Sequence, residues 1–218
     1  MIHGLRMDQH GTFNMGQGET DQWRPFTAEQ IVRPGHPGFL WNARIRMLPI
    51  LSARVHDAYV DGGGLLHGAL FGAVTVMEAR DTRAIARGEL LRFLAESPWY
   101  PTALLPSQGT RWEAVDDNSA RVTLTNPNAW SGPLDVTMLF RFDSDGTVES
   151  VFAEERDAEV NGEFIPTPWE GRWRGYTEHS GMMIPTEGEV AWLFPERRKT
   201  YWRGTVTNIA FEFAPMRS

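Results

Sequence analysis

The sequence predicts a mainly β fold with a minor α component: a curved antiparallel sheet, or half-barrel, of roughly ten strands wrapped around one main helix. Three observations lead to this prediction. Apolar and polar residues alternate with a period of two along most of the chain, which is the pattern of half-buried strands. Turn-forming residues separate these runs at short intervals. A single longer stretch, residues 84–96, has helical spacing instead.

The strands of the N-terminal half follow from the alternation. Residues 41–47 show it most clearly, with Trp41 and Ile45 on one face and Arg44 on the other. Residues 61–64, Asp-Gly-Gly-Gly, are a strong turn signal and separate two further runs. The other strands predicted in this half are residues 5–15, 52–61 and 66–80, the last a long strand with bends at Gly68 and Gly72.

The C-terminal half reads as a series of hairpins. Residues 143–146, Asp-Ser-Asp-Gly, form a turn in which Gly146 can supply the positive φ angle that such turns favour. Consecutive strands joined by short turns run in opposite directions, so the sheet is expected to be antiparallel. The predicted strands here are residues 111–115, 120–125, 134–142, 148–157, 170–179, 188–194 and 200–213.

Residues 84–96 are predicted to form the main helix. The leucines and Phe93 fall at helical spacing, and Pro98 ends the run. A helix that is apolar over most of its circumference must be buried, so we expect it against the concave side of the sheet. Thr27 is a plausible N-cap for a second, shorter helical turn. Since no internal boundary is evident, residues 1–218 are expected to form one domain.

Composition and motifs argue against several function classes. The net charge of −7 and the lack of a basic stripe disfavour nucleic-acid binding. The absence of cysteine excludes disulfides and thiolate nucleophiles. The six histidines have no metal-ligand spacing, and no P-loop, nucleophile elbow or dinucleotide fingerprint occurs, so neither a metal nor a cofactor is expected. His56 and Asp57 are interpreted as a polar, outward-facing pair on a strand.

No apolar run approaches the length of about 20 residues that spans a bilayer, so no membrane span is expected. The N-terminal residues lack the apolar core of a signal peptide, which makes a cytoplasmic location the default expectation. A removed leader or a membrane tether in a longer protein would change that expectation. The sequence does not specify an oligomeric state.

The predicted helix carries one stripe with ionisable side chains, Glu89, Arg92 and Glu96. If this stripe is exposed, the three residues form ordinary i,i+3 and i,i+4 ion pairs. If it faces a cavity, desolvation would raise the pKa of a glutamate towards neutrality and make it a usable acid or base. The pattern alone leaves both interpretations open.

Tryptophan and arginine recur together in the C-terminal half. Trp173 and the arginines on either side of it must point to opposite faces of a strand. Arg172 would share its face with Tyr176, and Arg172 or Arg203 would meet Glu189 on a neighbouring strand. Such contacts form either a cross-strand charge ladder or a polar patch that binds a carboxylate or phosphate.

Two prolines stiffen the run Ile-Pro-Thr-Pro-Trp at residues 165–169 and cannot donate ladder hydrogen bonds. This run is therefore predicted to form a rigid loop at the rim of the sheet. Trp169, at its end, would lie over the core or over the entrance of a cavity.

Several runs of the sequence carry a resemblance: residues 23–30 (WRPFTAEQ), 37–47 (PGFLWNARIRM), 88–96 (GELLRFLAE), 99–106 (WYPTALLP), 166–169 (PTPW), 188–192 (GEVAW) and 201–204 (YWRG). Together they resemble a widespread bacterial family known only as a domain of unknown function. Its layout is similar to the half-barrel folds of lipoprotein carriers, in which a curved antiparallel sheet closes over a helix and holds an acyl chain. A cofactor-free enzyme of pigment biosynthesis has the same shape, so the resemblance implies a fold and no activity.

Two functions therefore stay open. The first is a binding module that holds an apolar or amphipathic small molecule in the concave cavity, as the nine tryptophans and the largely apolar helix indicate. The binding residues proposed for it are Trp41, Arg44, Arg92, Phe93, Trp99, Trp169, Arg172, Tyr176, Trp192 and Arg203.

The second is a cofactor-independent hydrolase, lyase or isomerase. Its acid or base would be Glu89, Glu96 or Glu189. Arg44, Arg172 or Arg203 would stabilise an anion. An enzyme requires a desolvated carboxylate beside a charged partner in the cavity, whereas a carrier requires an apolar floor with its charges at the rim.

Overall fold

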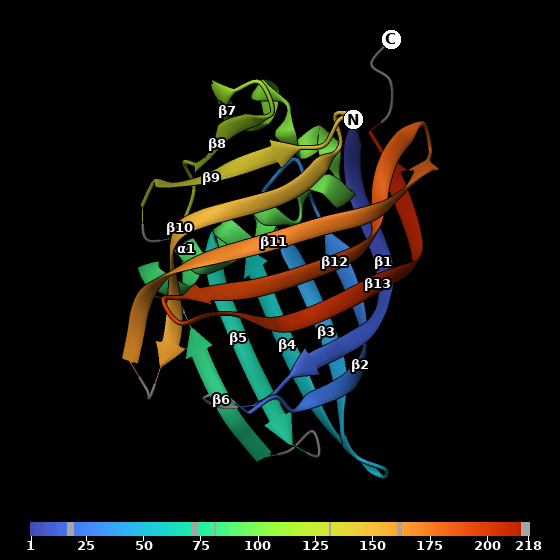
Figure 1. Ribbon diagram of the computed structural model, residues 1–218, viewed down its shortest axis with the longest axis vertical. Helices are drawn as coiled ribbons and strands as arrows, with labels where there is room; N and C mark the ends of the chain where they lie inside the picture. Colours follow the sequence, from blue (N-terminus) through green and yellow to red (C-terminus); the bar gives the residue numbers. More distant parts are fainter. Residues whose placement is uncertain (17–19, 71–73, 81, 131, 161–162, 215–218) are drawn as a thin grey trace.

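The structure, a computed structural model, describes residues 1–16, 20–70, 74–80, 82–130, 132–160 and 163–214. In this part of the chain thirteen strands form one antiparallel sheet in the order β6-β5-β4-β3-β2-β1-β13-β12-β11-β10-β9-β8-β7. The sheet is strongly curved and unclosed, and the helix lies on its concave side (Figure 1). The predicted half-barrel is confirmed, with more strands than the sequence indicated.

The N-terminal half of the sheet contains β1 (Ile2–Asn14), β2 (Trp23–Val32), β3 (Phe39–Leu48), β4 (Leu51–Val60), β5 (Gly63–Leu70) and β6 (Val74–Arg80). The C-terminal half contains β7 (Thr110–Asp116), β8 (Ser119–Asn126), β9 (Leu134–Phe142), β10 (Val148–Val160), β11 (Glu163–His179), β12 (Met182–Phe194) and β13 (Arg197–Phe213). Between them lie the helix α1 (Arg83–Ala95) and the short 3₁₀ helices η1 (Ser97–Trp99), η2 (Pro101–Leu104) and η3 (Pro106–Gln108).

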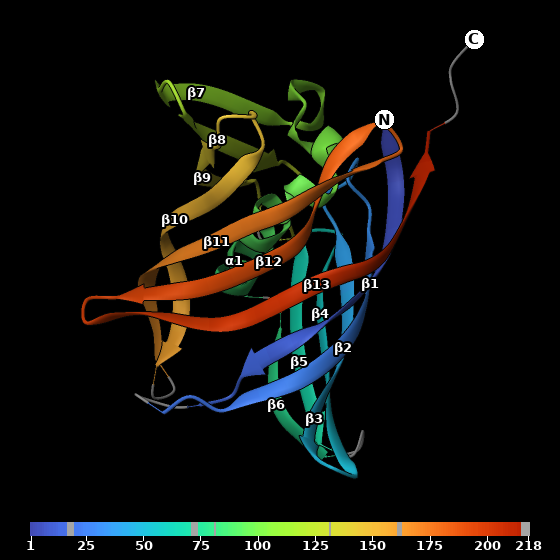
Figure 2. The same ribbon diagram turned by 45° about the vertical axis from the view of Figure 1, so that its right-hand side comes forward.

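The two halves join where the first strand pairs with the last. β1 pairs with β2 on one side and with β13 on the other, so the beginning and end of the described chain lie together in the middle of the sheet. The strands of the two halves cross at a steep angle, and α1 lies between them (Figure 2). The helix contacts β4 and β5 of the first half and β9 and β10 of the second.

The main helix is confirmed within one residue of its predicted start and end. Thr82 is its N-cap, and the Thr82 hydroxyl accepts a hydrogen bond of 3.2 Å from the backbone N–H of Ile85. The side chains of Leu90, Leu91 and Leu94 are almost fully buried. Their burial against the curved sheet supplies the main reason for the helix to form here, because helices of this length gain most of their stability from packing.

Three local predictions are wrong. Thr27 begins no helical turn, since it lies within β2 and pairs with His10 and with Arg44. Residues 66–80 form two strands, β5 and β6, and the predicted bend at Gly72 lies outside the described residues. Residues 165–169 belong to β11 and form no rim loop. The prolines are tolerated there because pairing with β12 begins only at Trp169.

Glycines on the concave face leave room for large rings. Gly188 and Gly204 are cross-strand partners, and Gly188 also pairs with Trp173. A Cβ atom at Gly188 would lie 2.5 Å from the ring of Trp173, and one at Gly204 would lie 2.3 Å from the ring of Trp202. Both indole rings therefore lie against the sheet surface, which could not happen beside larger residues.

Candidate ligand-binding cavity

A cavity of about 810 Å³ lies between α1 and the concave face of the sheet. Its volume falls within the range of about 300–1,000 Å³ that is typical of small-molecule sites. Six tryptophans line it: Trp41, Trp99, Trp169, Trp173, Trp192 and Trp202. The charged side chains that line it are Asp57, Glu89, Arg92, Glu96, Arg156, Asp157 and Lys199. Exposed residues such as Met15 and Ala84 also border it, which places its entrance near them.

Trp99 is the centre of the aromatic floor. It makes edge contacts with Trp173 at a centroid distance of 4.7 Å and with Trp202 at 6.4 Å. The indole Nε1 of Trp99 donates a hydrogen bond of 3.0 Å to the carbonyl oxygen of Pro185, and the residue is 1% exposed. Since the polar atom of this ring is satisfied within the fold, its apolar surface is fixed towards the cavity.

A buried ion-pair cluster occupies the wall formed by α1 and β4. The guanidinium of Arg92 donates to Asp57 and, over 2.7 Å, to Glu96. It also lies over the rings of Phe39 and Trp41, at 4.7 Å and 5.1 Å from their centroids. Burial alone would lower the pKa of Arg92, but the carboxylates of Glu96 and Asp57 raise it, so Arg92 stays charged.

A chain of hydrogen bonds that runs through three strands ends at the carboxylate of Glu96. The amide of Gln30 donates a bond of 2.6 Å to Glu96, and Gln9 donates one of 3.2 Å to Gln30. The indole N–H of Trp41 completes the chain with a bond of 2.9 Å to Gln9. Sequence reasoning missed both glutamines. The available signal was a polar residue at an inward position of an alternating strand, because such a residue needs a buried partner.

Glu89 is a buried carboxyl of the cavity wall. It is 6% exposed, and its Oε2 atom has no hydrogen-bond partner among the described residues. Burial raises the pKa of Glu89 well above its usual range, and the negative charge of Asp57 raises it further. The charges of Arg156 and Arg92 oppose this rise. The shift favours the neutral form of the carboxyl, which can donate a proton or a hydrogen bond. This is the property that the sequence assigned to a stripe facing a cavity.

The interpretation of Asp57 as an outward-facing residue is wrong. Asp57 is 8% exposed, lines the cavity and pairs with Arg92. His56, its neighbour on β4, lies on the other face and contacts Asn42 through Nδ1 at 2.6 Å. The alternation along β4 was correct, but it does not say which of two adjacent polar residues faces the core.

Sequence reasoning also missed Arg156. Its guanidinium lies over the rings of Trp169 and Trp192, at 5.1 Å and 5.6 Å from their centroids. It also donates a hydrogen bond of 3.3 Å to the hydroxyl of Tyr201. Trp192 stacks on Tyr201 at 5.9 Å. This aromatic group belongs to the C-terminal strands β10 to β13, whereas the Arg92 cluster belongs to α1 and β4.

Seven of the residues proposed from the sequence line this cavity: Trp41, Glu89, Arg92, Glu96, Trp99, Trp169 and Trp192. Six do not: Arg44, Phe93, Arg172, Tyr176, Glu189 and Arg203.

Two of these six pack within the fold and one is exposed. Phe93 packs on Tyr100 at a centroid distance of 5.2 Å. Tyr176 donates a hydrogen bond of 2.7 Å to the carbonyl oxygen of Val148. Arg44 is exposed and lies opposite Arg54 in the sheet.

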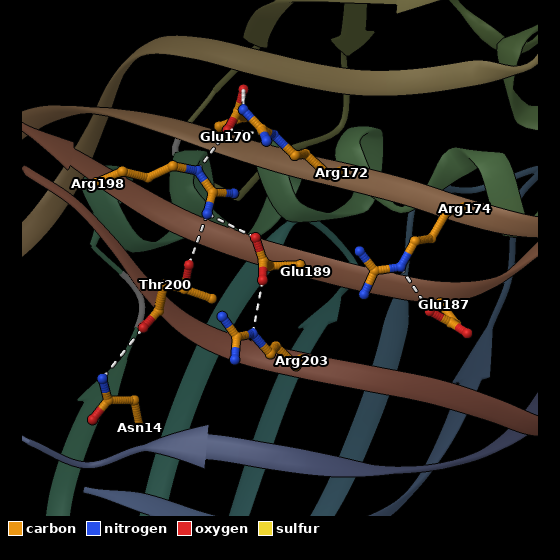
Figure 3. Close-up of polar contacts among 9 residues, drawn as sticks. All are labelled: Asn14, Glu170, Arg172, Arg174, Glu187, Glu189, Arg198, Thr200 and Arg203. Carbon is orange, nitrogen blue, oxygen red and sulfur yellow. Dashed lines mark hydrogen bonds and ion pairs between the residues drawn. The ribbon is translucent and has the colours of Figure 1, made fainter. Parts of the chain in front are cut away.

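The other three belong to a charge ladder on the outer face of β11, β12 and β13 (Figure 3). Arg203 bonds to Glu189 over 2.7 Å, and Arg198 bonds to the same carboxylate over 2.7 Å. Arg172 pairs with Glu170 over 2.9 Å. Burial would raise the pKa of Glu189, but the two arginines outweigh it and lower the pKa. The carboxylates are thus neutralised within the ladder, which cross-links the strands.

In the described part of the chain, no three His, Cys, Asp or Glu side chains are grouped closely enough to hold a metal ion. None of the described helices is both long enough and apolar enough to cross a membrane.

A model of a family of unknown function, DUF6920, matches residues 1–211, and the chain belongs to this family. A comparison with curated proteins found no match. The resemblance that the sequence carries, to an uncharacterised family with a carrier-like half-barrel, is confirmed.

Two solved structures have a similar fold. One is an outer membrane lipoprotein-sorting protein domain from Vibrio parahaemolyticus, with a TM-score of 0.50 and 9% identity over 98% of this chain and 87% of that one. The other is a LolA superfamily protein from Nitrosomonas europaea, with a TM-score of 0.50 and 10% identity over 98% of this chain and 88% of that one. At such low identity the likeness concerns the fold alone.

Proposed function

We propose that this member of DUF6920 binds a small apolar or amphipathic molecule in the cavity between α1 and the sheet. The observation that carries the proposal is a cavity of about 810 Å³ lined by six tryptophans. Small-molecule sites are mostly apolar and aromatic, with a few polar groups that orient the ligand. The lipoprotein-sorting name of one structural neighbour supports a carrier function, although it describes that protein. A cytoplasmic location stays a prediction.

The cavity walls are arranged before any ligand enters. Trp99 is fixed by its bond to Pro185, and Trp169 by a bond of 2.9 Å from its Nε1 to the hydroxyl of Tyr201. A side chain that is already immobilised loses little conformational entropy when a ligand packs on it, so more of the binding free energy remains.

The first experiment is native mass spectrometry of the purified protein beside a solvent extract of the denatured protein. A co-purifying apolar or amphipathic molecule is the expected result. Binding of a fluorescent single-chain amphiphile is then measured by the change that it causes in the fluorescence of the cavity tryptophans.

Gly88 offers a substitution that fills the cavity without a clash. It lies on α1, lines the cavity, and a Cβ atom there would meet nothing within 4 Å. Gly88→Phe should abolish binding of the amphiphile while the helix stays intact. Gly88→Ala is the matched control: it should bind as the wild type does, and it should be more stable by about 0.5–1 kcal/mol because glycine disfavours helix interiors. Unchanged binding by Gly88→Phe, or an empty wild type that binds no amphiphile, contradicts the proposed function.

One observation favours a second candidate, a cofactor-independent enzyme. Glu89 is a buried carboxyl in the cavity wall, and burial and the charge of Asp57 raise its pKa against the opposing charges of Arg156 and Arg92. A neutral glutamic acid in such a place can serve as a general acid towards a bound substrate. Turnover in a panel of hydrolase, lyase and isomerase substrates that is lost in Glu89→Gln, with binding retained, would support it. An inactive wild type across the panel leaves the binding function as the better account.

A further inference from the structure

Two β-bulges bring polar side chains to one wall of the cavity. The first bulge lies in β10, where Ala153 pairs with Trp169 but the next pair is Arg156 with Thr167. β10 thus has one residue more than β11 across this interval. An inserted residue reverses the face to which the following side chains point. As a result residues 154–155 are both exposed and Arg156 faces the cavity.

The second bulge lies in β13. Val190 pairs with Trp202, whereas the adjacent Ala191 pairs with Thr200, so Tyr201 is the extra residue. Tyr201 and Trp202, although neighbours in sequence, both line the cavity for this reason. Bulges re-aim side chains and are frequent beside functional sites. Here two independent bulges place Arg156 and Tyr201 in hydrogen-bond contact.

Arg156 is held in place, and its charge opposes the rise in the pKa of Glu89 that burial causes, so the two groups act on each other across the cavity. The rings of Trp169 and Trp192 flank its guanidinium, and one of its N–H groups donates to Tyr201. No carboxylate forms an ion pair with it among the described residues, and its other N–H groups have no acceptor there. Guanidinium groups present five N–H donors in a fixed plane, so several remain for a ligand.

Tyr201 has one donor left. Its hydroxyl oxygen accepts hydrogen bonds from Trp169 Nε1 at 2.9 Å and from Arg156 at 3.3 Å. These two bonds use both lone pairs of the oxygen. The hydroxyl proton has no acceptor within the described chain, so it is available to a bound group. A guanidinium and a phenol O–H directed at one point form a donor set for a carboxylate or phosphate oxygen.

Among the described residues, the other two cations that line the cavity, Arg92 and Lys199, already have partners. Arg92 already bonds to two carboxylates and has no need of an anionic ligand. Lys199 faces the cavity in the same cross-strand row as Trp169 and Trp192, and its ammonium donates a bond of 2.8 Å to the carbonyl oxygen of Gly16.

We propose that the cavity takes an anionic amphiphile, whose carboxylate or phosphate binds Arg156 and Tyr201 while its apolar chain lies on the tryptophan floor. This inference rests on the proposed binding function and adds the chemical class of the ligand. Tyr201 and Trp202 are consecutive, so the anion site and the floor adjoin.

The test compares three compounds with the same twelve-carbon chain, dodecanoate, dodecyl phosphate and dodecanol, with inorganic phosphate, which has no chain. Isothermal titration calorimetry measures each against the wild type, Arg156→Gln, Arg156→Lys and Tyr201→Phe. Arg172→Gln is the control, because Arg172 lies on the outer face and pairs with Glu170. The wild type should bind both anionic amphiphiles about ten- to a hundredfold more tightly than dodecanol, and inorganic phosphate not measurably.

Arg156→Gln should lose this preference and still bind dodecanol as the wild type does, which also shows that the variant is folded. Arg156→Lys should retain part of the preference, Tyr201→Phe should lose part of it, and Arg172→Gln should behave as the wild type. Equal affinity of the wild type for dodecanoate and dodecanol, or undiminished dodecanoate binding by Arg156→Gln, overturns the anion site and leaves the binding function intact. Tight binding of inorganic phosphate overturns the proposal that the ligand is an amphiphile, because the anion site would then bind without an apolar chain. Failure of every chain compound to bind overturns the proposed function itself.

Discussion

The buried carboxyl of Glu89 should make stability depend on pH in a way that one substitution removes. In the folded protein, burial and the charge of Asp57 raise the pKa of Glu89 well above its usual range. In the unfolded chain the same carboxyl ionises near pH 4.3, roughly its ordinary value. Between these two pKa values the folded protein holds one proton that the unfolded chain has released.

The sign follows from this difference. Stability rises with pH where the unfolded chain binds more protons and falls where the folded protein binds more. Glu89 is the second case, so its contribution lowers the free energy of unfolding as pH rises from the unfolded towards the folded pKa. The slope for one proton is about 1.4 kcal/mol per pH unit. For a chain of this size, that corresponds to about 3–6 °C in Tm per pH unit.

Glu89→Gln removes the titration and keeps a side-chain N–H that can donate towards Asp57. Urea unfolding of both proteins between about pH 4.5 and 8 should therefore give curves that diverge, with the variant gaining stability over the wild type as pH rises. Glu149→Gln, at an exposed position of β10, is the control and should run parallel to the wild type. Parallel curves for Glu89→Gln as well would mean that Glu89 is ionised in the folded state, and the reasoning would be refuted.

Three further substitutions test the packing and charges around the cavity. Gly188→Ala should cost about 1–3 kcal/mol in urea unfolding, because its Cβ atom would enter the ring of Trp173 at 2.5 Å. Arg92→Met leaves two buried carboxylates without their cation and should cost about 3–5 kcal/mol in urea unfolding. Thr82→Ala removes the N-cap of α1 and should cost about 1 kcal/mol, measured by thermal unfolding followed by circular dichroism.

The fold was predictable wherever one face of an element is packed. β3 was predicted from the alternation of Trp41 and Ile45 with Arg44, and in the structure the first two are buried and the third exposed. The main helix was predicted because its apolar residues require burial on nearly every side. The turn at Thr27 was predicted from a capping residue alone, and the pairing of β2 with two neighbours overrode that local preference.

The site was only partly predictable, because its polar members depend on contacts between distant strands. The stripe of Glu89 and Arg92 was visible from helical spacing. Asp57 completes the cluster. Its neighbour His56 is also polar, and the sequence does not indicate which of the two side chains faces the core. Arg156 was hidden for a stronger reason: the bulge before it breaks the alternation on which its orientation would have been judged.

The cavity therefore arises where the sheet departs from regular alternation. With strict alternation along β10, Arg156 would point outward with Phe152 and Glu154, and the aromatic wall would contain no cation. With a larger residue at Gly188, the ring of Trp173 would be displaced from the sheet into the space that the ligand is proposed to occupy. Register shifts also occur elsewhere in the sheet, for example between Asp8 and Gln9 in β1 and between Ala114 and Asp116 in β7. The shifts in β10 and β13 bring the guanidinium of Arg156 and the hydroxyl of Tyr201 into contact inside the cavity. A cation and a phenol held together on an aromatic wall are the physical reason for proposing that this wall binds an anion.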